Sequence, residues 1–373
     1  MHRRLGVFAA IVLFAASLSV PAAQAKNHML VGMQDDAMVL SGNPDFTFKT
    51  LKQLRVQIVR VNLNWNLVAK RRPAHPQDPA DPAYDWALYD RAVRFAGQNG
   101  MQVLMTILFV PSWANGGKPK NVPPSNYNDL RNFAYAAAER YSGHYIPNTD
   151  RFDETYLPAV KYWLAWNEPN NPNWLKQTSG GRFVSPRFYA RICTSIYQGV
   201  HFTNFAGEKV GCGATGPRGN NQARSSRPSM SPVAFMTAAK KAGLRSLDAY
   251  SHHPYYGRPS ETPRTRPGGN AIELGNINTL IAAVNKLWGK KRIWITEYGW
   301  QTPPDRIFGV SYARQAAYVR QSFAIARRNP RIDLMVWFIL RDDTNLGIGW
   351  QSGMLTSRGN RKPAFGVFAR LPH

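Results

Sequence analysis

The feature that most constrains the fold of this chain is a regular alternation of short apolar runs with segments of helical periodicity. Eight runs rich in Val, Ile, Leu or aromatic residues are typical of buried strands: 29–33, 57–62, 102–108, 162–166, 209–214, 247–251, 292–296 and 334–339. Most of the intervening segments have apolar residues at helical spacing: 85–99, 127–141, 186–201, 232–242, 276–288 and 312–328. This alternation predicts an α/β fold in which a parallel sheet is covered by helices.

The number of rounds decides between two architectures of that class. Eight strand–helix rounds favour a single closed (β/α)8 TIM barrel over an open, doubly wound sheet. No G-x-G-x-x-G motif follows the first predicted strand, which argues against a dinucleotide-binding fold. We therefore expect one barrel domain over residues 26–373 and see no sign of a second domain.

The first 25 residues have the pattern of a secretory signal peptide rather than of a folded element. Arg3 and Arg4 precede an apolar run over 5–20, and Ala23-Gln24-Ala25 supplies the small residues of a cleavage site. An uncleaved membrane anchor is the alternative, and the shortness of the run argues against it. We expect cleavage after Ala25, secretion of the mature protein, and no membrane span thereafter.

The formal net charge of +25, from 47 Lys and Arg against 22 Asp and Glu, favours anionic partners. The basic residues are scattered without a block of five or more, and no nucleic-acid-binding motif is recognisable. A solvated basic surface is the main interpretation, and we do not expect nucleic acid as a partner. Binding to an anionic cell-wall surface is a second interpretation of the charge.

The chain has only two cysteines, Cys193 and Cys212, and they lack the spacing of a metal site. In an exported protein they form either one disulfide or two buried thiols, and both alternatives are open at this point. The sequence predicts neither a metal nor another cofactor.

Two glutamates stand where the chain leaves predicted strands. Glu168 follows the fourth strand and precedes Pro169, and Glu297 ends the seventh strand. Catalytic residues of (β/α)8 barrels lie at these strand ends. Glycoside hydrolysis needs one carboxyl group that donates a proton and one ionised carboxylate, so the pair fits that chemistry. The alternative is that each glutamate is a structural salt-bridge partner.

The residues around both glutamates carry a family resemblance. Asn167-Glu168-Pro169 and Thr296-Glu297-Tyr298-Gly299 resemble the motifs of clan A glycoside hydrolases, which are retaining (β/α)8 enzymes. The resemblance extends over nearly all of the mature chain, and it is strongest to the cellulase-like and xylosidase-like families. It implies that Glu168 is the general acid/base and that Glu297 is the nucleophile.

Two polar residues are expected to support these carboxylates. Arg60 lies within an apolar strand, where a charge needs a partner. Glu297 is the expected partner, with Asp35 as the alternative. Asn167 is expected to donate a hydrogen bond to the sugar 2-hydroxyl, a contact that strengthens in the transition state.

The sequence His252-His253-Pro254-Tyr255 follows the sixth predicted strand. Adjacent side chains on an extended segment point to opposite faces, so only one histidine faces the site. The resemblance favours His253, and we expect His252 to be a core histidine. Tyr255 is expected to hydrogen-bond Glu297 and orient it.

Further residues are expected to contact saccharide. Trp337 on the eighth strand is a candidate for stacking on a sugar ring, with core packing as the alternative. Other tryptophans that follow strands are candidates for additional subsites: Trp65, Trp113, Trp300 and Trp350. Asp35 and Asp36 follow the first strand and are candidates for binding substrate hydroxyls.

Together these features predict a secreted retaining glycoside hydrolase that cleaves β-linked oligo- or polysaccharide through a glycosyl-enzyme. Two alternatives from other classes remain open. One is a non-catalytic carbohydrate-binding barrel, which would keep the aromatic residues and lose a carboxylate. The other is a basic protein that adheres to the cell wall or to nucleic acid, for which only the charge argues.

Overall fold

The computed structural model describes residues 29–147, 155–203, 207–345 and 349–372. The predicted signal peptide, residues 1–25, lies outside these ranges. No helix within them is long and apolar enough to cross a bilayer.

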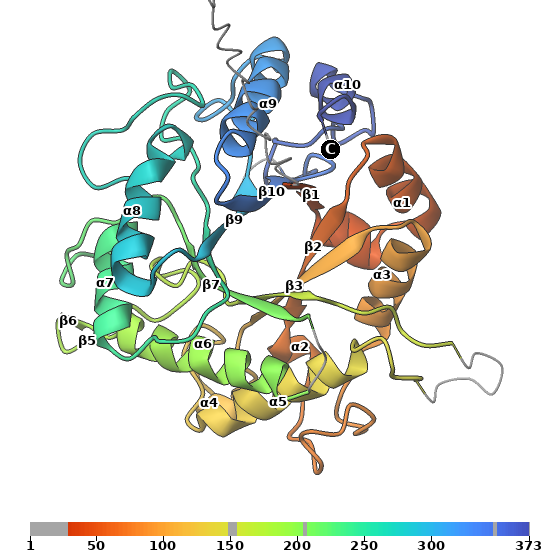
Figure 1. Ribbon diagram of the computed structural model, residues 1–373, viewed down its shortest axis with the longest axis vertical. Coiled ribbons are helices and arrows are strands. Elements are labelled where there is room, and N and C mark those ends of the chain that lie inside the picture. The colour runs from red at the N-terminus through yellow and green to blue at the C-terminus, as the bar shows by residue number, and fades with distance from the viewer. Residues whose placement is uncertain (1–28, 148–154, 204–206, 346–348, 373) are drawn as a thin grey trace, which may run out of the picture.

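Eight parallel strands close into a barrel at the centre of the molecule (Figure 1). The strands are β1 (Leu30–Gln34), β2 (Ile58–Asn64), β3 (Gln102–Leu108), β4 (Tyr162–Ala165), β7 (Lys209–Thr215), β8 (Ala249–His252), β9 (Arg292–Tyr298) and β10 (Ile332–Phe338). Their order around the barrel is β1-β10-β9-β8-β7-β4-β3-β2, so strands consecutive in the barrel are also consecutive in the chain. This is the predicted (β/α)8 fold.

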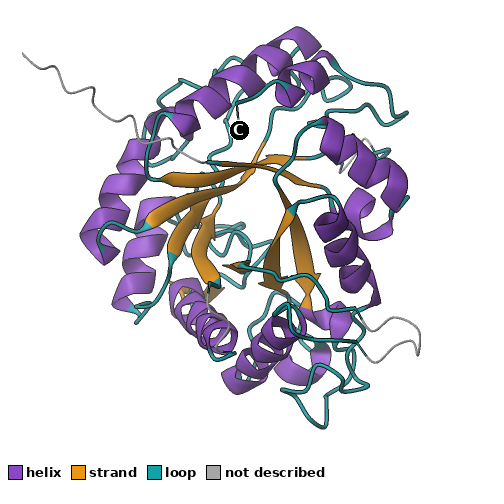
Figure 2. Ribbon diagram, turned by 45° about the vertical axis from the view of Figure 1, so that its right-hand side comes forward, coloured by secondary structure: helices purple, strands orange, loops and turns teal. Residues whose placement is uncertain are grey.

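Helices form a ring around the barrel (Figure 2). One longer helix follows each barrel strand: α1 (Pro44–Gln53), α3 (Ala87–Gln98), α5 (Tyr127–Arg140), α6 (Ser185–His201), α7 (Pro232–Lys241), α8 (Ile277–Trp288), α9 (Tyr312–Arg327) and α10 (Pro363–Ala369). Shorter elements lie in the loops that leave the strands: a π-helical turn (Ala37–Ser41), α2 (Trp65–Val68), α4 (Ser112–Asn115), the hairpin β5–β6 (Thr178–Ser179 and Arg182–Phe183) and a 3-10 turn (Leu274–Asn276).

All eight predicted strands and all six predicted helices are confirmed, with ends displaced by three residues or fewer. Helices α1 and α10, which flank the barrel at the beginning and end of the domain, were not predicted from the sequence. Both have a proline at the start of the helix, and Asn43 caps α1 by accepting a hydrogen bond from the Phe46 amide. These capping signals were present, but the apolar stripes of the two helices are too short to have been recognised.

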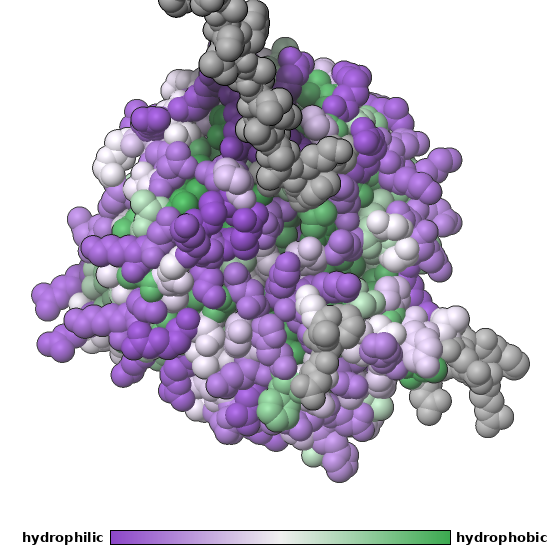
Figure 3. Space-filling model, viewed as in Figure 1, coloured by the Kyte–Doolittle hydropathy of each residue, from purple (hydrophilic) through white to green (hydrophobic). Residues whose placement is uncertain are grey.

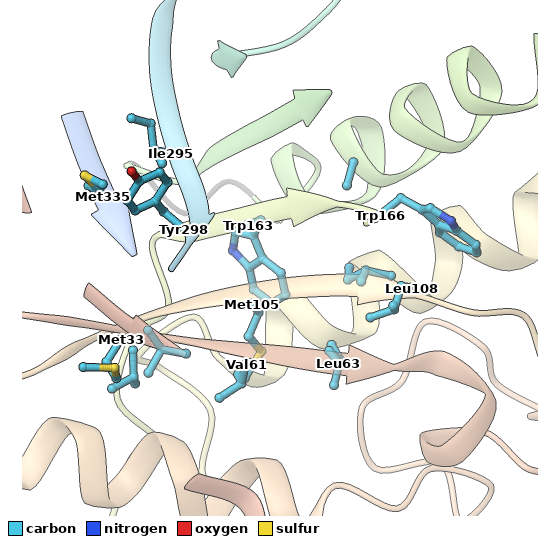
Figure 4. Packing of buried hydrophobic residues seen from close by; sticks show 14 of the residues in the cluster. Met33, Val61, Leu63, Met105, Leu108, Trp163, Trp166, Ile295, Tyr298 and Met335 are labelled. Atoms are coloured by element: carbon cyan, nitrogen blue, oxygen red, sulfur yellow. The ribbon is translucent and has the colours of Figure 1, made fainter. Parts of the chain in front are cut away.

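The core has an inner and an outer part. The inner part fills the barrel with side chains from several strands, among them Ile58, Leu104, Leu164 and Trp294. The outer part lies between the strands and the helices and is much larger. Figure 4 shows some of it, with side chains from β1, β2, β3, β4, β9 and β10. The barrel is therefore a packed core at its base, and any binding site must lie above this packing.

Strand β2 shows how the barrel interior changes from apolar to polar along its axis. Alternate residues of a strand share a face, so Ile58, Arg60 and Asn62 all point inward. Ile58 belongs to the inner core, Arg60 lies fully buried above it, and Asn62 lines a cavity at the barrel mouth. The same strand thus contributes to packing, to a buried charge and to the wall of the cavity.

Two strands carry an extra residue at the mouth of the barrel. Ile295 of β9 pairs with Met335 of β10, and Tyr298 pairs with Trp337. Two residues of β9 therefore lie between these pairs, against one residue of β10. On β7 the pairing has a similar irregularity between Cys212 and Thr215. Such β-bulges re-aim side chains and are frequent beside active sites.

Cys193 of α6 and Cys212 of β7 form a disulfide, with their Cα atoms 6.2 Å apart. The structure thereby decides between the two alternatives that the sequence left open, a disulfide and two buried thiols.

The surface seen in Figure 3 is mostly hydrophilic, with apolar residues scattered over it rather than gathered in one patch.

Candidate active site

Glu168 lies just beyond the end of β4, in an unusual backbone conformation. Its φ angle is +33° and that of Trp166 is +70°, a region that residues other than glycine rarely adopt. The Glu168 amide donates a hydrogen bond to the Ala214 carbonyl at 2.9 Å, within the bulge of β7. The Asn171 side-chain amide donates to Glu168 Oε2 at 2.9 Å. The turn after β4 therefore holds this carboxyl group in a defined position over the barrel.

Glu297 lies on the bulged part of β9, next to the inward-facing Thr296. Its Oε2 forms an ion pair with Arg60 Nη1 at 2.8 Å, and its Oε1 accepts a hydrogen bond from the Tyr255 hydroxyl at 2.9 Å. Both predicted contacts of Glu297 are confirmed, and Arg60 does not pair with Asp35. A charge pair and a hydroxyl donor both stabilise the ionised form of a carboxyl group.

Arg60 is fully buried and connects four strands through its guanidinium. Besides Glu297 on β9, it donates to Gln34 Oε1 at the end of β1, to Thr106 Oγ1 on β3 and to Asn167 Oδ1 after β4, at 2.6–3.0 Å. A buried guanidinium is tolerated only when its donors are satisfied, and each of its three nitrogens has an acceptor here.

His253 lies between the two carboxyl groups. Its Nδ1 is 3.2 Å from Glu168 Oε1 and 3.7 Å from Glu297 Oε2, so these two oxygens are at most about 7 Å apart. The limit includes the roughly 5 Å separation that a retaining glycosidase requires. The structure thus brings together the two glutamates that the sequence placed on separate strands.

The titration behaviour of the site follows from burial. Burial raises the pKa of Glu168, so this group keeps its proton to higher pH than an exposed glutamate. Burial lowers the pKa of His253 to about 3, so its ring is neutral near pH 7. A neutral ring carries one N–H. With this hydrogen on Nδ1, His253 donates to Glu168 and its Nε2 accepts from the Thr296 hydroxyl at 3.0 Å.

His252 points away from the site, as predicted. It is fully buried, and its ring nitrogens lie 2.8 Å from Thr215 Oγ1 and 3.0 Å from the Ile272 carbonyl. It connects β8 to β7 through Thr215 and to the loop after β8 through Ile272, and its ring nitrogens bond to neither glutamate.

Both carboxyl groups line one cavity of about 440 Å³ at the barrel mouth, a size typical of small-molecule sites. Its lining is rich in amide and aromatic side chains: Gln34, Asn62, Asn167, Asn171, Asn173, Trp174, Tyr255, Tyr256, Gln301, Phe308, Phe338 and Trp350. Because Asn167 Oδ1 accepts from Arg60, its NH2 group is left to donate to a molecule in the cavity. This agrees with the predicted contact to a sugar hydroxyl.

Four of the five predicted tryptophans do not line this cavity. Trp337 is fully buried among outward-facing side chains and donates to the Ser352 carbonyl at 2.8 Å, whereas its neighbour Phe338 lines the cavity. Trp300 is buried and stacks on Tyr256 with the ring centres 3.7 Å apart. Trp113 donates to a carbonyl of the loop after β2. Trp337 and Trp300 are fully buried, so the predictions for these two residues are wrong, whereas the half-buried Trp113 stays a predicted residue of a further subsite.

The other loop residues are divided. Trp350 lines the cavity and lies against Tyr255, with the ring centres 5.2 Å apart, whereas Trp65 is fully buried. Asp35 does not bind substrate in this arrangement, because it is buried outside the cavity lining and accepts hydrogen bonds from backbone amides, among them those of Leu340 and Arg341. It joins the ends of β1 and β10 instead, and burial raises its pKa to about 6.

Several residues of the site were not predicted from the sequence. Asn62 shares a face with Arg60, so strand periodicity was a usable signal for it. Its Nδ2 donates to Asp36 Oδ2 at 2.8 Å. Gln34 is the last residue of β1, and Glu297 lies one residue before the end of β9, so the position of Gln34 at a strand exit was a second such signal. Asn171 and Gly216 reach Glu168 through turns whose shape no periodicity reveals.

Within the described ranges, no cluster of three or more His, Cys, Asp or Glu side chains could hold a metal ion. The cavity lining presents carboxyl, amide and hydroxyl groups, together with aromatic faces.

Comparison with known families explains this arrangement. A model of the glycosyl hydrolase catalytic core matches residues 145–368, a segment that contains both glutamates. The chain belongs to the glycosyl hydrolase catalytic core family. A search of curated proteins finds no match.

Solved structures of glycosidases have the same fold. The chain is similar to a family 39 glycoside hydrolase from Bacteroides cellulosilyticus WH2 (TM-score 0.65, 19% identity, covering 92% of this chain and 63% of that one). It is also similar to a monomeric β-xylosidase from Caulobacter crescentus CB15 (TM-score 0.64, 14% identity, covering 92% of this chain and 68% of that one). A fungal β-1,4-galactanase is similar as well (TM-score 0.57, 17% identity, covering 92% of this chain and 99% of that one). At these identities the likeness concerns the fold alone. The chain spans about two thirds of the first two structures.

Proposed function

We propose that this protein is a secreted glycosidase that cleaves β-linked saccharides with retention of configuration. Glu297 is the nucleophile and Glu168 the general acid/base. The observation that carries the proposal is that both carboxyl groups lie within 3.7 Å of one histidine nitrogen and line a single cavity. Their environments differ, as two carboxyl groups with opposite roles require.

In the first step Glu297 attacks the anomeric carbon. Arg60 and Tyr255 both contact the Glu297 carboxylate and fix its orientation. Glu168 holds its proton because burial raises its pKa, and it transfers this proton to the leaving oxygen. The C–O bond breaks, and a glycosyl ester forms on Glu297.

In the second step Glu168, now a carboxylate, removes a proton from water, and the water oxygen attacks the anomeric carbon. The ester bond to Glu297 breaks, the sugar leaves with its original configuration, and Glu168 is protonated again. The free NH2 group of Asn167 donates to the sugar 2-hydroxyl in both steps. Neutral His253 donates to Glu168 without competing as a charged acid.

Hydrolysis of aryl β-glycosides by purified protein tests the proposal. We expect the Glu297→Gln variant to lose at least about a thousandfold in kcat/KM, because the nucleophile is removed. Glu168→Ala should lose about a hundredfold or more with a poor leaving group and far less with dinitrophenolate, which departs without a proton. Glu139→Gln, on α5, is a matched control. Release of the inverted anomer, seen by NMR, would refute retention.

Secretion is supported by the pattern of residues 1–25 and by the disulfide, because disulfides persist in oxidising compartments. We expect protein recovered from the culture medium of a secreting host to begin at Lys26. Mass spectrometry of the intact protein measures this directly. Recovery of protein that still begins at Met1, in the cell pellet only, would argue against the leader.

A further inference from the structure

The face of the barrel that carries the active site is divided into two halves of different charge. Four adjacent strands, β3, β4, β7 and β8, lead into loops 109–126, 166–184, 216–231 and 253–273. In the sequence these loops contain 10 Lys and Arg against 3 Asp and Glu, and one of the three acids is Glu168. We call these loops the basic rim.

The other four strands, β1, β2, β9 and β10, lead into loops of similar total length: 35–43, 65–86, 299–311 and 339–362. They contain 8 Lys and Arg and 8 Asp and Glu, so their formal charge is zero. The general excess of bases in the chain therefore does not account for the basic rim, because the opposite half of the same face does not share it.

The charges of the basic rim are available to a ligand. All of its Lys and Arg side chains are exposed, whereas Glu261 is half-buried and Glu273 is buried. All four loops lie wholly within the described ranges. Glu261 accepts hydrogen bonds from two backbone amides of its own loop. The exposed charge on this half of the face is thus entirely positive.

Three bases from two of these loops lie at or next to the wall of the cavity. Arg218 lines it, and its guanidinium is held by the Tyr256 carbonyl at 3.1 Å and by Glu273. Arg227 donates to Asn173, another cavity residue, at 3.3 Å.

Lys120 reaches the same wall through aromatic contacts. Its Nζ lies 4.0 Å from the ring centre of Phe109, and that ring stacks on the cavity residue Trp174 at 5.6 Å. The positive charge therefore continues from the cavity outward over the rim.

We propose that the substrate is an anionic polysaccharide whose chain runs from the cavity over the basic rim, with carboxylate or sulfate groups facing its Lys and Arg side chains. This inference rests on the proposed function, since it names the substrate class of the same site. A neutral saccharide makes no use of a charge confined to one half of the cleft. A repeating anionic chain is attracted along its whole length, and this attraction is weakened by salt.

The experiment compares two double variants with the same change in charge. Arg224→Glu/Arg227→Glu reverses two charges on the basic rim, and Arg306→Glu/Arg358→Glu reverses two exposed charges on the opposite half. Binding to immobilised polygalacturonate, dextran sulfate and neutral dextran is measured at 20 and 300 mM NaCl. The two anionic polymers distinguish carboxylate from sulfate as the recognised group.

We expect the parent to bind at least one anionic polymer, to release it in high salt and to ignore dextran. The rim variant should bind about tenfold more weakly than the opposite-half variant. Equal losses in both variants would overturn the proposal, because net charge alone would then explain binding. Stronger retention of duplex DNA than of either polymer, with the same loss in the rim variant, would also overturn it.

Cleavage assays separate this proposal from the proposed function. Activity on aryl β-glycosides without any preference for anionic over neutral polymers would leave the glycosidase mechanism intact and reject the anionic substrate. Salt-sensitive binding at the basic rim without hydrolysis of any glycoside would instead reject the mechanism and retain the binding surface.

Discussion

At the scale of single residues, burial opposes several stabilising contacts in setting the pKa of Glu168, and the largest of these contacts is the hydrogen bond from Asn171. Burial disfavours the charged form and raises the pKa, and this is the larger effect. The hydrogen bond from Asn171 stabilises the charged form and lowers it. The same group must donate a proton in the first step and accept one in the second, so its pKa has to lie between the values that either effect alone would give.

Removal of the Asn171 amide should therefore shift the pH profile. In the Asn171→Ala variant the ionised form of Glu168 loses a donor, so its pKa rises further. Because protonated Glu168 is the acid, kcat/KM is lost as pH rises through this pKa. The alkaline limb should move upward by about half to one pH unit. Initial rates on an aryl β-glycoside between pH 4 and 10 measure the shift.

Asn173→Ala is the control for this experiment, since Asn173 also lines the cavity but is not among the groups that shift the pKa of Glu168. A downward shift in Asn171→Ala, or an equal shift in the control, would contradict the role given to Asn171.

Gly216 has a different effect on the same carboxyl group. A Cβ atom at this position would lie 3.0–3.1 Å from three atoms of the Glu168 carboxyl group, closer than ordinary packing allows. We expect Gly216→Ala to displace Glu168 and to lower kcat/KM by about tenfold or more, while the melting temperature changes little. Gly268→Ala, where a Cβ meets nothing within 4 Å, is the control. An unchanged kcat/KM in Gly216→Ala would contradict the prediction, because the position of Glu168 would then not limit catalysis.

At the scale of elements, strand periodicity predicted some side-chain directions and failed at others. It separated His253 from His252, because two adjacent residues of a regular strand cannot face the same side. The same periodicity carried a signal for Asn62, which shares a face with Arg60, but no prediction was made from it. The extra residue of β9 breaks this rule, since Thr296 and Glu297 both turn toward the barrel mouth. The direction of Trp337 was predicted wrongly because adjacent strand residues face opposite sides. Phe338 faces the cavity, and Trp337, one residue earlier, packs in the outer core.

The loop after β10 is fixed by a buried ion pair. Lys362 Nζ lies 2.7 Å from Asp342 Oδ1, 2.9 Å from Thr302 Oγ1 and 3.0 Å from the Gln351 carbonyl. Both charged side chains are almost inaccessible to solvent. The pair connects the start of α10 to the segment that carries Trp350, so it fixes one aromatic wall of the cavity.

Breaking this pair should cost more than neutralising it. Lys362→Met leaves the Asp342 charge buried without a partner, and we expect the free energy of unfolding to fall by about 3 kcal/mol. Asp342→Asn/Lys362→Met removes both charges and should recover part of this loss. Urea denaturation of the parent, both single variants and the double variant measures the coupling. Strictly additive losses would show that the two groups do not interact.

At the scale of the whole molecule, the fold was predictable and parts of the site were not. Eight apolar runs separated by helical segments define a closed barrel, because each run is buried on both faces and each helix covers one side. The two glutamates were found because barrel strands end at one common rim. The positions of Asp35, Trp113 and Trp300 depend on loop conformation, which is set by local hydrogen bonds such as those to the Asp35 carboxylate.

One covalent link acts on the whole chain rather than on the site. The disulfide between Cys193 and Cys212 closes a loop across a sequence separation of 19 residues and ties α6 to β7. Such a link stabilises the fold mainly by restricting the unfolded chain, by about 3 kcal/mol for a loop of this size.

The disulfide should therefore affect stability while sparing the chemistry. We expect Cys193→Ser/Cys212→Ser to lower the free energy of unfolding by about 3 kcal/mol, and its kcat at 25 °C to stay close to that of the parent. Urea denaturation with and without dithiothreitol measures this, since the reductant should destabilise the parent and leave the variant unchanged. A parent whose stability is indifferent to the reductant would mean that the thiols contribute by packing, because closure of the loop would then add nothing.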